Sequence, residues 1–536
     1  MTALLHNPLT HCIPIYWVIF ILHNQTLVRH LIYTCLTALA ILTGSSVMAS
    51  AQPYYVATTG SDSNAGTIAS PFRSIEKAVS VVKAGETIYV RGGIYNLTAT
   101  ITLGKSGTAS AGITMTSYPG EKPVLDFSGQ TLGGSNRGVV LTGSWWHIKG
   151  FVIRGAGDNG MLITGGNNNT VELCSFFRNR DSGMQLDNGA SNNTIVNCDS
   201  YHNADPPDYG DADGFAPKLT VGTGNRFVGC RAWLNCDDGW DGYLRGANDV
   251  STTLENCWAF RNGYLEDDTD AGANANGNGF KMGGSDDKTL AHNFTLKNCL
   301  AFGNKAKGFD QNSNRGSMTL YNCTGHGNLV ANYRIKTELD AGKILTLKNC
   351  AEFGGTAELA AFAVQEKNSW LPPFTVTAAD FRSTDTTGAT GPRKSDGSLP
   401  HIEYMHLAAG SDLIDAGVNV GIPFAGTAPD LGCFETGLTG ISRTGAPVSS
   451  AIFYPNPVRS TGYLLLDSDE TGRCEVRLHD VTGRFVRTLA DIQAEPGETI
   501  LTADLSGIRD GIYFCRILLH GKPLYTIRIL KVSSAV

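Results

Sequence analysis

A short frame of cysteine and asparagine recurs along the middle of the chain, and it constrains the fold more than any other feature. The frame reads Cys, any residue, a small residue, an aromatic residue or His, any residue, Asn; the first copy differs in having Phe176 at the small position. A seventh copy at Cys350 has Gly355 in place of the asparagine. The six complete copies are Cys174 with Asn179, Cys198 with Asn203, Cys230 with Asn235, Cys257 with Asn262, Cys299 with Asn304, and Cys323 with Asn328.

The spacing of the copies indicates a stacked β structure. Successive cysteines are 24, 32, 27, 42, 24 and 27 residues apart. A period of ~24 residues suits three short strands and three turns, which make one rung of a parallel β-helix. Alternation of apolar and polar residues over 295–302 favours strands over helical or leucine-rich repeats. Rungs ~4.8 Å apart place equivalent residues in ladders.

Two ladders follow from this stacking. The cysteine row becomes an interior stack of free thiols, which act as small hydrophobic groups. Neighbouring cysteines of the row also come within reach of disulfide distance, which is the alternative. The asparagine row forms a turn ladder whose amides bond to adjacent rungs and tolerate left-handed backbone. We assign these asparagines a structural role and no chemistry.

Composition agrees with an all-β chain and excludes some functions. Only 17% of the 536 residues are charged, against a usual ~25%, and 63 are glycine. A net charge of −7 and a pI of about 6.0 leave no global basic field, so nucleic-acid binding is not expected. The length admits a solenoid with accessory domains.

The N-terminus predicts export. Apolar runs at 13–22 and 31–42 are each shorter than the ~20 residues of a membrane helix. The second run follows Arg29 and ends near Ala49-Ser-Ala51, a small-residue cleavage pattern. We therefore expect residues 1–51 to be a secretion signal; an N-terminal membrane anchor is the alternative.

One edge of the predicted solenoid carries insertions. In the first five copies, the asparagine is followed by a glycine and a bulky apolar residue, after intervals of 4, 11, 4, 17 and 4 residues. The two long rungs therefore gain their extra residues at the same edge. Insertions repeated on one face usually build a binding face.

Carboxylates gather at this edge. Asp213 and Asp238 each stand one residue before the glycine of their rung, and Asp237 and Asp241 belong to the second of these rungs. Lys281 shares the register of Asp241 on the next rung, so all five groups are expected within ~10 Å. Four close carboxylates repel unless protonated or neutralised, and oxygen ligands without His or thiolate favour Ca²⁺. The alternative is Asp-Gly turn chemistry without a metal.

Lys281 is the candidate base of this cluster; a solvated lysine on the outer face is the alternative. A neighbouring cation and partial desolvation would lower its pKa enough for proton abstraction. Such a pair suits elimination on an anionic polysaccharide. The lysine removes the C5 proton of a uronate and the C4 oxygen leaves, which gives a 4,5-unsaturated end.

Three motifs in this order resemble the family-nine polysaccharide lyases, pectate lyases built on a right-handed parallel β-helix. They are Asp213-Gly-Phe-Ala-Pro-Lys218, Cys236-Asp-Asp-Gly-Trp-Asp241 and Asn278-Gly-Phe-Lys281-Met-Gly-Gly284; segments 60–66 and 70–75 also match.

The resemblance covers most of residues 52–440 and implies a calcium-dependent pectate lyase that cleaves (1→4)-α-D-galacturonan. It implies that Lys281 is the base and that the catalytic Ca²⁺ is held by Asp213, Asp237, Asp238 and Asp241. Lys218 lies in a matching motif, and we hypothesise that it contacts a substrate carboxylate. The acidic insertion 266–270 either binds further calcium or only shapes the groove.

Two other functions remain open from the sequence. β-Helix polygalacturonases, which are hydrolases, have motifs superficially similar to Asp237-Asp238, 325–327 and 334–336. However, the rung of His326 is three rungs from Asp238, about 15 Å by ladder spacing, and no Asn-Thr-Asp precedes the aspartate pair. A non-catalytic carbohydrate-binding surface protein that uses calcium structurally is the second alternative.

A second domain is expected at the C-terminus. After a linker at 441–450, residues 451–536 show alternating strands typical of a small β-sandwich. This segment resembles the C-terminal sorting domains of the type IX secretion system; a carbohydrate-binding sandwich is the alternative. The resemblance implies export to the cell surface or the medium, with the secretion machinery and an anionic polysaccharide as partners. We expect a monomer.

Overall fold

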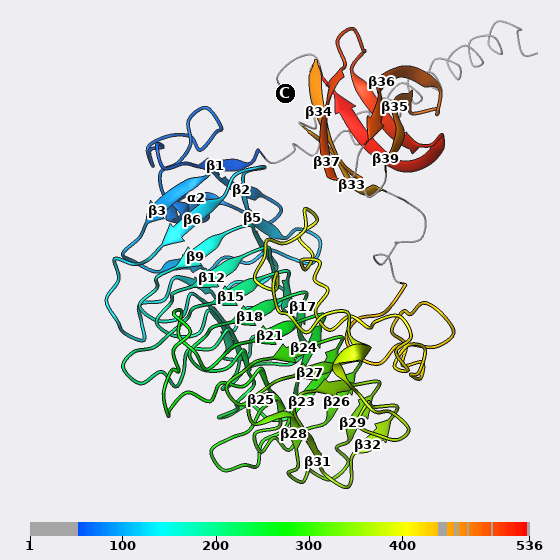
Figure 1. The fold of residues 1–536 in the computed structure, drawn as a ribbon. Helices are drawn as coiled ribbons and strands as arrows, with labels where there is room; N and C mark the ends of the chain where they lie inside the picture. Colours follow the sequence, from blue (N-terminus) through cyan, green and yellow to red (C-terminus); the bar gives the residue numbers. More distant parts are fainter. Residues whose placement is uncertain are drawn as a thin grey trace, which may run out of the picture. The chain divides into compact units, whose positions relative to one another are not determined.

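The computed structural model describes residues 52–437, 448–454, 458, 460–468, 471–494 and 497–532. The predicted secretion signal lies outside these residues, as does most of the predicted linker. Over the described ranges, no helix is long and apolar enough to cross a membrane. Figure 1 shows the strands of the first part stacked as successive coils, and a separate set of strands formed by the C-terminal residues.

Three parallel sheets run the length of the first part, and each coil contributes one strand to each sheet in turn. Sheet I contains β1 (Tyr54–Val56), β2 (Thr87–Val90), β5 (Ile113–Ser117), β8 (Trp146–Lys149), β11 (Thr170–Glu172), β14 (Thr194–Val196), β17 (Asn225–Val228), β20 (Val250–Glu255), β23 (His292–Lys297), β26 (Met318–Tyr321), β29 (Leu345–Lys348) and β32 (Val364–Glu366). Sheet II contains β3 (Gly93–Asn96), β6 (Pro123–Asp126), β9 (Val152–Arg154), β12 (Ser175–Phe177), β15 (Asp199–Tyr201), β18 (Arg231–Trp233), β21 (Trp258–Phe260), β24 (Leu300–Phe302), β27 (Thr324–His326) and β30 (Ala351–Phe353). Sheet III contains β4 (Ile101–Leu103), β7 (Val139–Leu141), β10 (Met161–Thr164), β13 (Met184–Asp187), β16 (Phe215–Pro217), β19 (Trp240–Asp241), β22 (Phe280–Lys281), β25 (Lys307–Asp310), β28 (Ala331–Ile335) and β31 (Ala357–Leu359).

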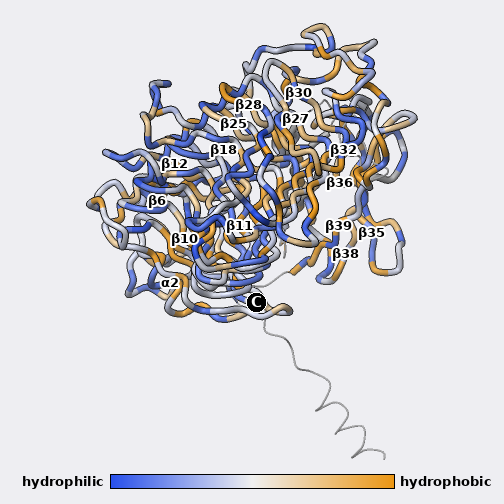
Figure 2. Tube along the Cα trace, turned by 90° about the horizontal axis from the view of Figure 1, so that it is seen from below, coloured by the Kyte–Doolittle hydropathy of each residue, from blue (hydrophilic) through white to orange (hydrophobic). Residues whose placement is uncertain are grey.

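This arrangement confirms the predicted right-handed parallel β-helix. Its strands are short, so inward and outward side chains alternate over only a few residues. In Figure 2, hydrophobic and hydrophilic stretches accordingly alternate along the coils. The short helix α2 (Ile75–Val81) packs near the first coils, with Ile75, Ala78 and Val79 buried.

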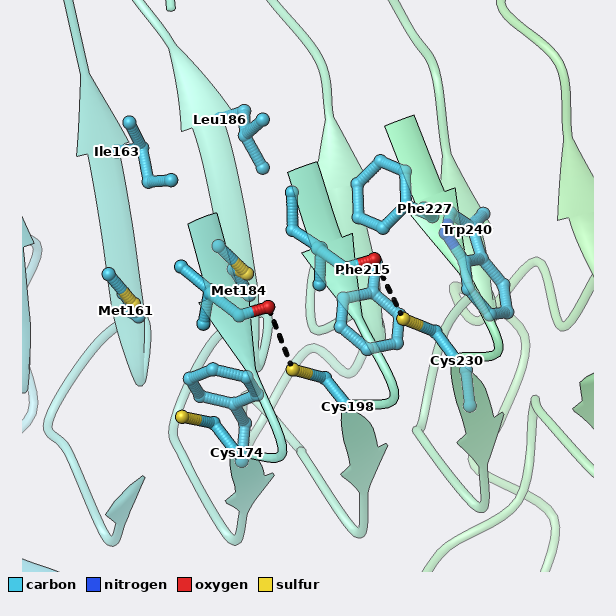
Figure 3. Packing of buried hydrophobic residues seen from close by; sticks show 14 of the residues in the cluster. Met161, Ile163, Cys174, Met184, Leu186, Cys198, Phe215, Phe227, Cys230 and Trp240 are labelled. Carbon is cyan, nitrogen blue, oxygen red and sulfur yellow. Dashed lines mark hydrogen bonds between the residues drawn. The ribbon is translucent and has the colours of Figure 1, made fainter. Parts of the chain in front are cut away.

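The cysteine ladder is confirmed as a buried stack of free thiols. Every cysteine of the repeat frame is buried and unpaired by disulfides. Figure 3 shows Cys174, Cys198 and Cys230 in successive coils, beside Met184 and Phe215 of sheet III. The thiols donate weak hydrogen bonds to backbone carbonyls, such as Cys198 Sγ to Val171 O at 3.5 Å. Each thiol therefore fills a small interior space without exposing a reactive group.

The asparagine ladder is also confirmed. Asn203 donates its side-chain amide to Oδ1 of Asn235 at 2.8 Å, and Asn235 does the same to Asn262 at 3.0 Å. The left-handed backbone lies one residue earlier than predicted, for example at His202 (φ 56°) and Leu234 (φ 50°). The turn therefore places the strain on the preceding residue and leaves the asparagine free to bond.

The segment from 370 to 437 packs against sheet II. Its Ile402, Tyr404 and Leu413 are buried together with Trp258 and Phe302 of the sheet. The segment contains a 3-10 helix, η1 (Ala378–Asp380), and otherwise consists mainly of turns, bends and irregular backbone. It covers an aromatic row that the sheet would otherwise expose.

The C-terminal residues form two antiparallel sheets, as predicted for a β-sandwich. Their strands are β33 (Val448–Tyr454), β34 (Thr461–Ser468), β35 (Gly472–Asp480), β36 (Phe485–Ala494), β37 (Gly497–Asp504), β38 (Gly511–Leu519) and β39 (Lys522–Lys531). They enclose a core of their own that includes Leu464, Val476 and Ile517. The first strand starts at Val448, within the range assigned above to the linker.

Candidate functional site

The strand register brings the predicted site residues together on sheet III. Asp241 in β19 pairs directly with Lys281 in β22, and Phe215 in β16 pairs with Trp240 in β19. Asp213 lies two residues before Phe215, and Asp238 lies two residues before Trp240. The two aspartates are therefore in register with each other, in the turns that lead into sheet III. In a strict strand, residues one before and two after the glycine would face opposite sides; because the aspartates before the glycine lie in turns, they need not follow that alternation.

Glycine is required in these turns because successive backbones approach closely. A Cβ atom on Gly214 would lie 2.6 Å from the carbonyl oxygen of Gly239, and one on Gly239 would lie 2.6 Å from that of Gly279. The glycines thus let the turns stack directly, and this stacking holds the flanking aspartates at the same height on neighbouring rungs.

The cluster is buried and contains two lysines. Asp213, Asp237, Asp238, Asp241 and Lys281 are each at most 7% exposed. Lys281 Nζ lies 3.1 Å from Asp238 Oδ2 and 3.3 Å from Asp241 Oδ1.

Lys218 also lies within the cluster, at 7% exposure. Its ammonium is 2.8 Å from Asp213 Oδ2 and 3.7 Å from Asp241 Oδ2. In this geometry Lys218 is shared between two carboxylates, and its contact with a substrate carboxylate stays a prediction.

The donor set fits a divalent cation. Asp213, Asp237 and Asp238 each offer an oxygen such that all three oxygens lie within 4.8 Å of one another. Over the described residues, Asp238 Oδ2 is buried and accepts no hydrogen bond of good geometry. Four carboxylates against two ammonium groups leave two negative charges uncompensated, which is the charge that one Ca²⁺ would supply.

The pKa shifts of the aspartates reflect their burial and the repulsion between neighbouring carboxylates. Burial and neighbouring carboxylates hold the pKa of Asp213 and Asp237 well above the ordinary value. Burial also raises the pKa of Asp238, although Lys281 opposes the shift. Burial by itself would also raise the pKa of Asp241. The positive charges of Lys281 and Lys218 outweigh that effect, so the pKa of Asp241 is lowered.

Lys281 differs from the sequence-based expectation in one respect. Burial alone would lower its pKa, but the surrounding carboxylates, Asp238 and Asp241 above all, raise the pKa well above its usual value. The lysine is therefore protonated in this arrangement. A cation among the carboxylates would oppose that effect, because it cancels the charges that retain the proton.

Sequence reasoning missed the groups that orient the aspartates. Asn278 donates its side-chain amide to Asp238 Oδ1 at 2.8 Å, and Asn276 donates its own to Asp237 Oδ2 at 3.2 Å. Asn278 occupies the same position before its glycine as Asp213 and Asp238 do, so the register contained this signal. Asn278 thus fixes Oδ1 of Asp238 and leaves Oδ2 to face Lys281, whereas Asn276 engages both oxygens of Asp237, one through its side-chain amide and one through its backbone N–H.

Two motifs weighed from the sequence lie elsewhere. The acidic insertion 266–270 is engaged in ion pairs: Glu266 with Arg178, and Asp270 with Lys305. His326 lies on sheet II, where it stacks on Phe353. Two acidic side chains of the insertion are therefore already paired with basic residues, and His326 does not join the acidic cluster.

The chain is similar to known proteins along most of its length. The family model described as "Pel9A-like, right handed beta helix region" matches residues 54–349, and the one described as "Secretion system C-terminal sorting domain" matches residues 452–531. Pectate lyase L of Dickeya dadantii (strain 3937) is 38% identical over 395 residues, which are 71% of this chain and 90% of that protein. Pectate lyase L of Paenibacillus polymyxa (strain SC2) is 40% identical over 412 residues, 72% of this chain and 89% of that protein. The crystal structure of pectate lyase Pel9A superposes with a TM-score of 0.66 at 39% identity, covering 71% of this chain and 96% of that one.

Proposed function

We propose that this chain, which belongs to the Pel9A-like right-handed β-helix family and is a polysaccharide lyase, is a calcium-dependent pectate lyase. It cleaves (1→4)-α-D-galacturonan by β-elimination and releases 4,5-unsaturated oligogalacturonates. The observation that carries this proposal is the buried acidic cluster, in which Lys281 lies 3.1 Å from Asp238.

Calcium is the proposed cofactor, held by Asp213, Asp237, Asp238 and Asp241. When bound, it supplies positive charge that attracts a uronate carboxylate and acidifies the α proton of that sugar. The donor set supports this choice, since it consists of carboxylate oxygens without histidine, and its one adjacent cysteine, Cys236, is buried.

Lys281 is the proposed base. In its neutral form, which a cation among the carboxylates would favour, its Nζ accepts the proton from C5 of the uronate, and the electrons of that C–H bond form the C4=C5 double bond. The C4–O bond breaks, and the departing oxygen takes a proton from solvent. Because Lys281 is only 7% exposed, bulk water has little access to the amine.

The proposed enzyme acts outside the cell. The chain carries a type IX sorting domain and is a secreted or cell-surface protein. We propose the division into a signal at 1–51, a lyase domain at 52–440, a linker at 441–450 and a sorting domain at 451–536, with the mature protein as a monomer.

The direct test is ultraviolet absorbance of the conjugated double bond during incubation with polygalacturonate. We expect absorbance to rise with calcium, to stop when EDTA is added, and to resume when calcium is restored in excess.

Two other results would replace the proposal. New reducing ends without absorbance would indicate a hydrolase. Binding of the polymer with neither signal would indicate a carbohydrate-binding protein.

A further inference from the structure

A second group of side chains lies beside Lys281, in the turns that leave sheet III. Tyr243 and Arg245 follow β19, and Asp286 follows β22, so they come from the two rungs that carry Asp241 and Lys281. We call these three residues the Tyr243 wall. Their side chains take no part in the proposed proton transfer, and the one hydrogen bond to the acidic cluster comes from the Tyr243 backbone N–H, which donates to Asp241 Oδ1 at 3.0 Å.

Backbone pairing and side-chain contacts hold the wall together. Leu244 is fully buried and bridges Leu219 and Ser285 on the adjacent rungs. The Tyr243 hydroxyl donates to Asp286 Oδ1 at 2.6 Å, and Arg245 Nε lies 3.3 Å from Asp286 Oδ2. The tyrosine and the arginine are thus joined to one carboxylate.

The wall connects the buried lysine to solvent. Lys281 Nζ lies over the Tyr243 ring, 5.5 Å from its centroid, and the Arg245 guanidinium lies 5.8 Å from the same centroid. The Arg245 side chain is 61% exposed. Apart from the ion pair with Asp286, its guanidinium makes no hydrogen bond to any residue that the structure describes.

We infer that the Tyr243 wall is a substrate-binding subsite, in which the Tyr243 ring packs against the sugar presented to Lys281 and Arg245 pairs with the carboxylate of an adjoining uronate. The inference rests on the proposed function, because it needs a polyuronate bound beside Lys281. A guanidinium with unused N–H groups binds a carboxylate well, whereas a methyl ester offers it no charge. The wall would therefore favour de-esterified stretches of the polymer.

The test compares KM and kcat for Arg245→Gln on polygalacturonate and on partly methyl-esterified pectin, at saturating calcium. On polygalacturonate we expect KM to rise roughly fivefold with kcat within about twofold, as for the loss of one exposed charge-assisted hydrogen bond. On the esterified polymer we expect a smaller rise. Arg245→Lys should restore part of the affinity, and Tyr243→Phe, which keeps the ring, should perturb KM less than Tyr243→Leu.

Arg226→Gln is the matched control, because Arg226 is an exposed arginine in an ion pair with Glu255 on sheet I. We expect this variant to behave as wild type. An unchanged KM for Arg245→Gln on polygalacturonate, or an equal rise on both polymers, would overturn the inference and leave the proposed function intact. Absence of unsaturated product from the wild type would instead overturn the proposed function on which the inference rests.

Discussion

Charge balance among buried side chains determines what the acidic cluster can do. Lys218 and Lys281 each contact two carboxylates, yet the cluster still has an excess of acid. Desolvation makes that excess costly, since a buried charge is stable only when it is paired. A divalent cation would relieve this cost and would also release Lys281 from the carboxylates that raise its pKa.

Asp238 should be essential for this cation. Substitution Asp238→Asn keeps the shape of the side chain but removes a ligand charge, so we expect calcium affinity to fall by at least roughly tenfold. Isothermal titration calorimetry with calcium measures the change. Asp270→Asn is the control, because Asp270 pairs with Lys305 in the acidic insertion. Equal calcium affinities of wild type and Asp238→Asn would show that Asp238 is not a calcium ligand.

His292 should make stability depend on pH. It is fully buried between Gly242 O and Thr252 Oγ1, and burial lowers its pKa from 6.5 to about 4. Between these two values the unfolded chain binds the proton more readily, so stability falls as pH drops from 6.5 towards 4. Between pH 7 and pH 5 the free energy of unfolding should fall by about 2 kcal/mol more in wild type than in His292→Gln. Urea denaturation at both pH values measures it, and parallel losses in the two proteins would refute it.

Residue types and register were sufficient to place the site, but not its internal pairing. Asp213, Asp238, Asp241 and Lys281 come together as expected because one frame repeats on consecutive rungs. The sequence does not say which carboxylate each ammonium meets, since that depends on rotamers across three rungs. For the same reason, the direction of the Lys281 pKa shift without a cation could not be predicted.

At the level of secondary-structure elements, ladders of hydrogen-bonded side chains stabilise the stacked coils. In the asparagine ladder, each side chain both donates to and accepts from its neighbours, so the turns between sheets II and III are bound together from rung to rung. Asp213, Asp237 and Asp238 lie in these same turns, after the ladder asparagines and before the strands of sheet III. The ladder therefore helps to hold the turns that carry the site.

Disrupting the asparagine ladder should lower the stability of the protein. Asn235 donates to Ser200 O and Asn262 Oδ1 and accepts from Asn203, all in buried surroundings. Asn235→Ala leaves several of these groups unpaired, so we expect the free energy of unfolding to fall by about 3 kcal/mol or more. Asn96→Ala is the control, because Asn96 is exposed in β3. This variant should change the free energy of unfolding by less than about 0.5 kcal/mol. Chemical denaturation of both variants checks the contrast, and similar losses would contradict the role of the ladder.

A second ladder escaped the sequence reasoning. Asn169 donates to Asn193 Oδ1 at 3.0 Å, and Asn193 donates to Asn225 Oδ1 at 3.1 Å. These residues lie five positions before Cys174, Cys198 and Cys230, so a fixed offset was present in the sequence. It stops after three members, because Thr252 occupies the next equivalent position, and a short run is hard to distinguish from chance.

At the scale of the whole molecule, contacts between residues far apart in the sequence are the hardest to predict from the sequence. Arg393, far along the chain, donates to Asp199 on sheet II, which also accepts from Arg231. No repeat leads to this contact, because residues 370–437 carry no periodic pattern. The family matches to the β-helix and the sorting domain together account for a lyase that acts outside the cell.

The most direct test of the central claim is product absorbance from Lys281→Ala on polygalacturonate at saturating calcium, with calcium affinity measured on the same sample. We expect the rate to fall by roughly a thousandfold, as for loss of a general base, while calcium still binds. Lys348→Ala is the control, since Lys348 pairs with Glu366 on sheet I, and it should keep the wild-type rate. A Lys281→Ala enzyme with the wild-type rate would contradict elimination by a lysine base beside calcium.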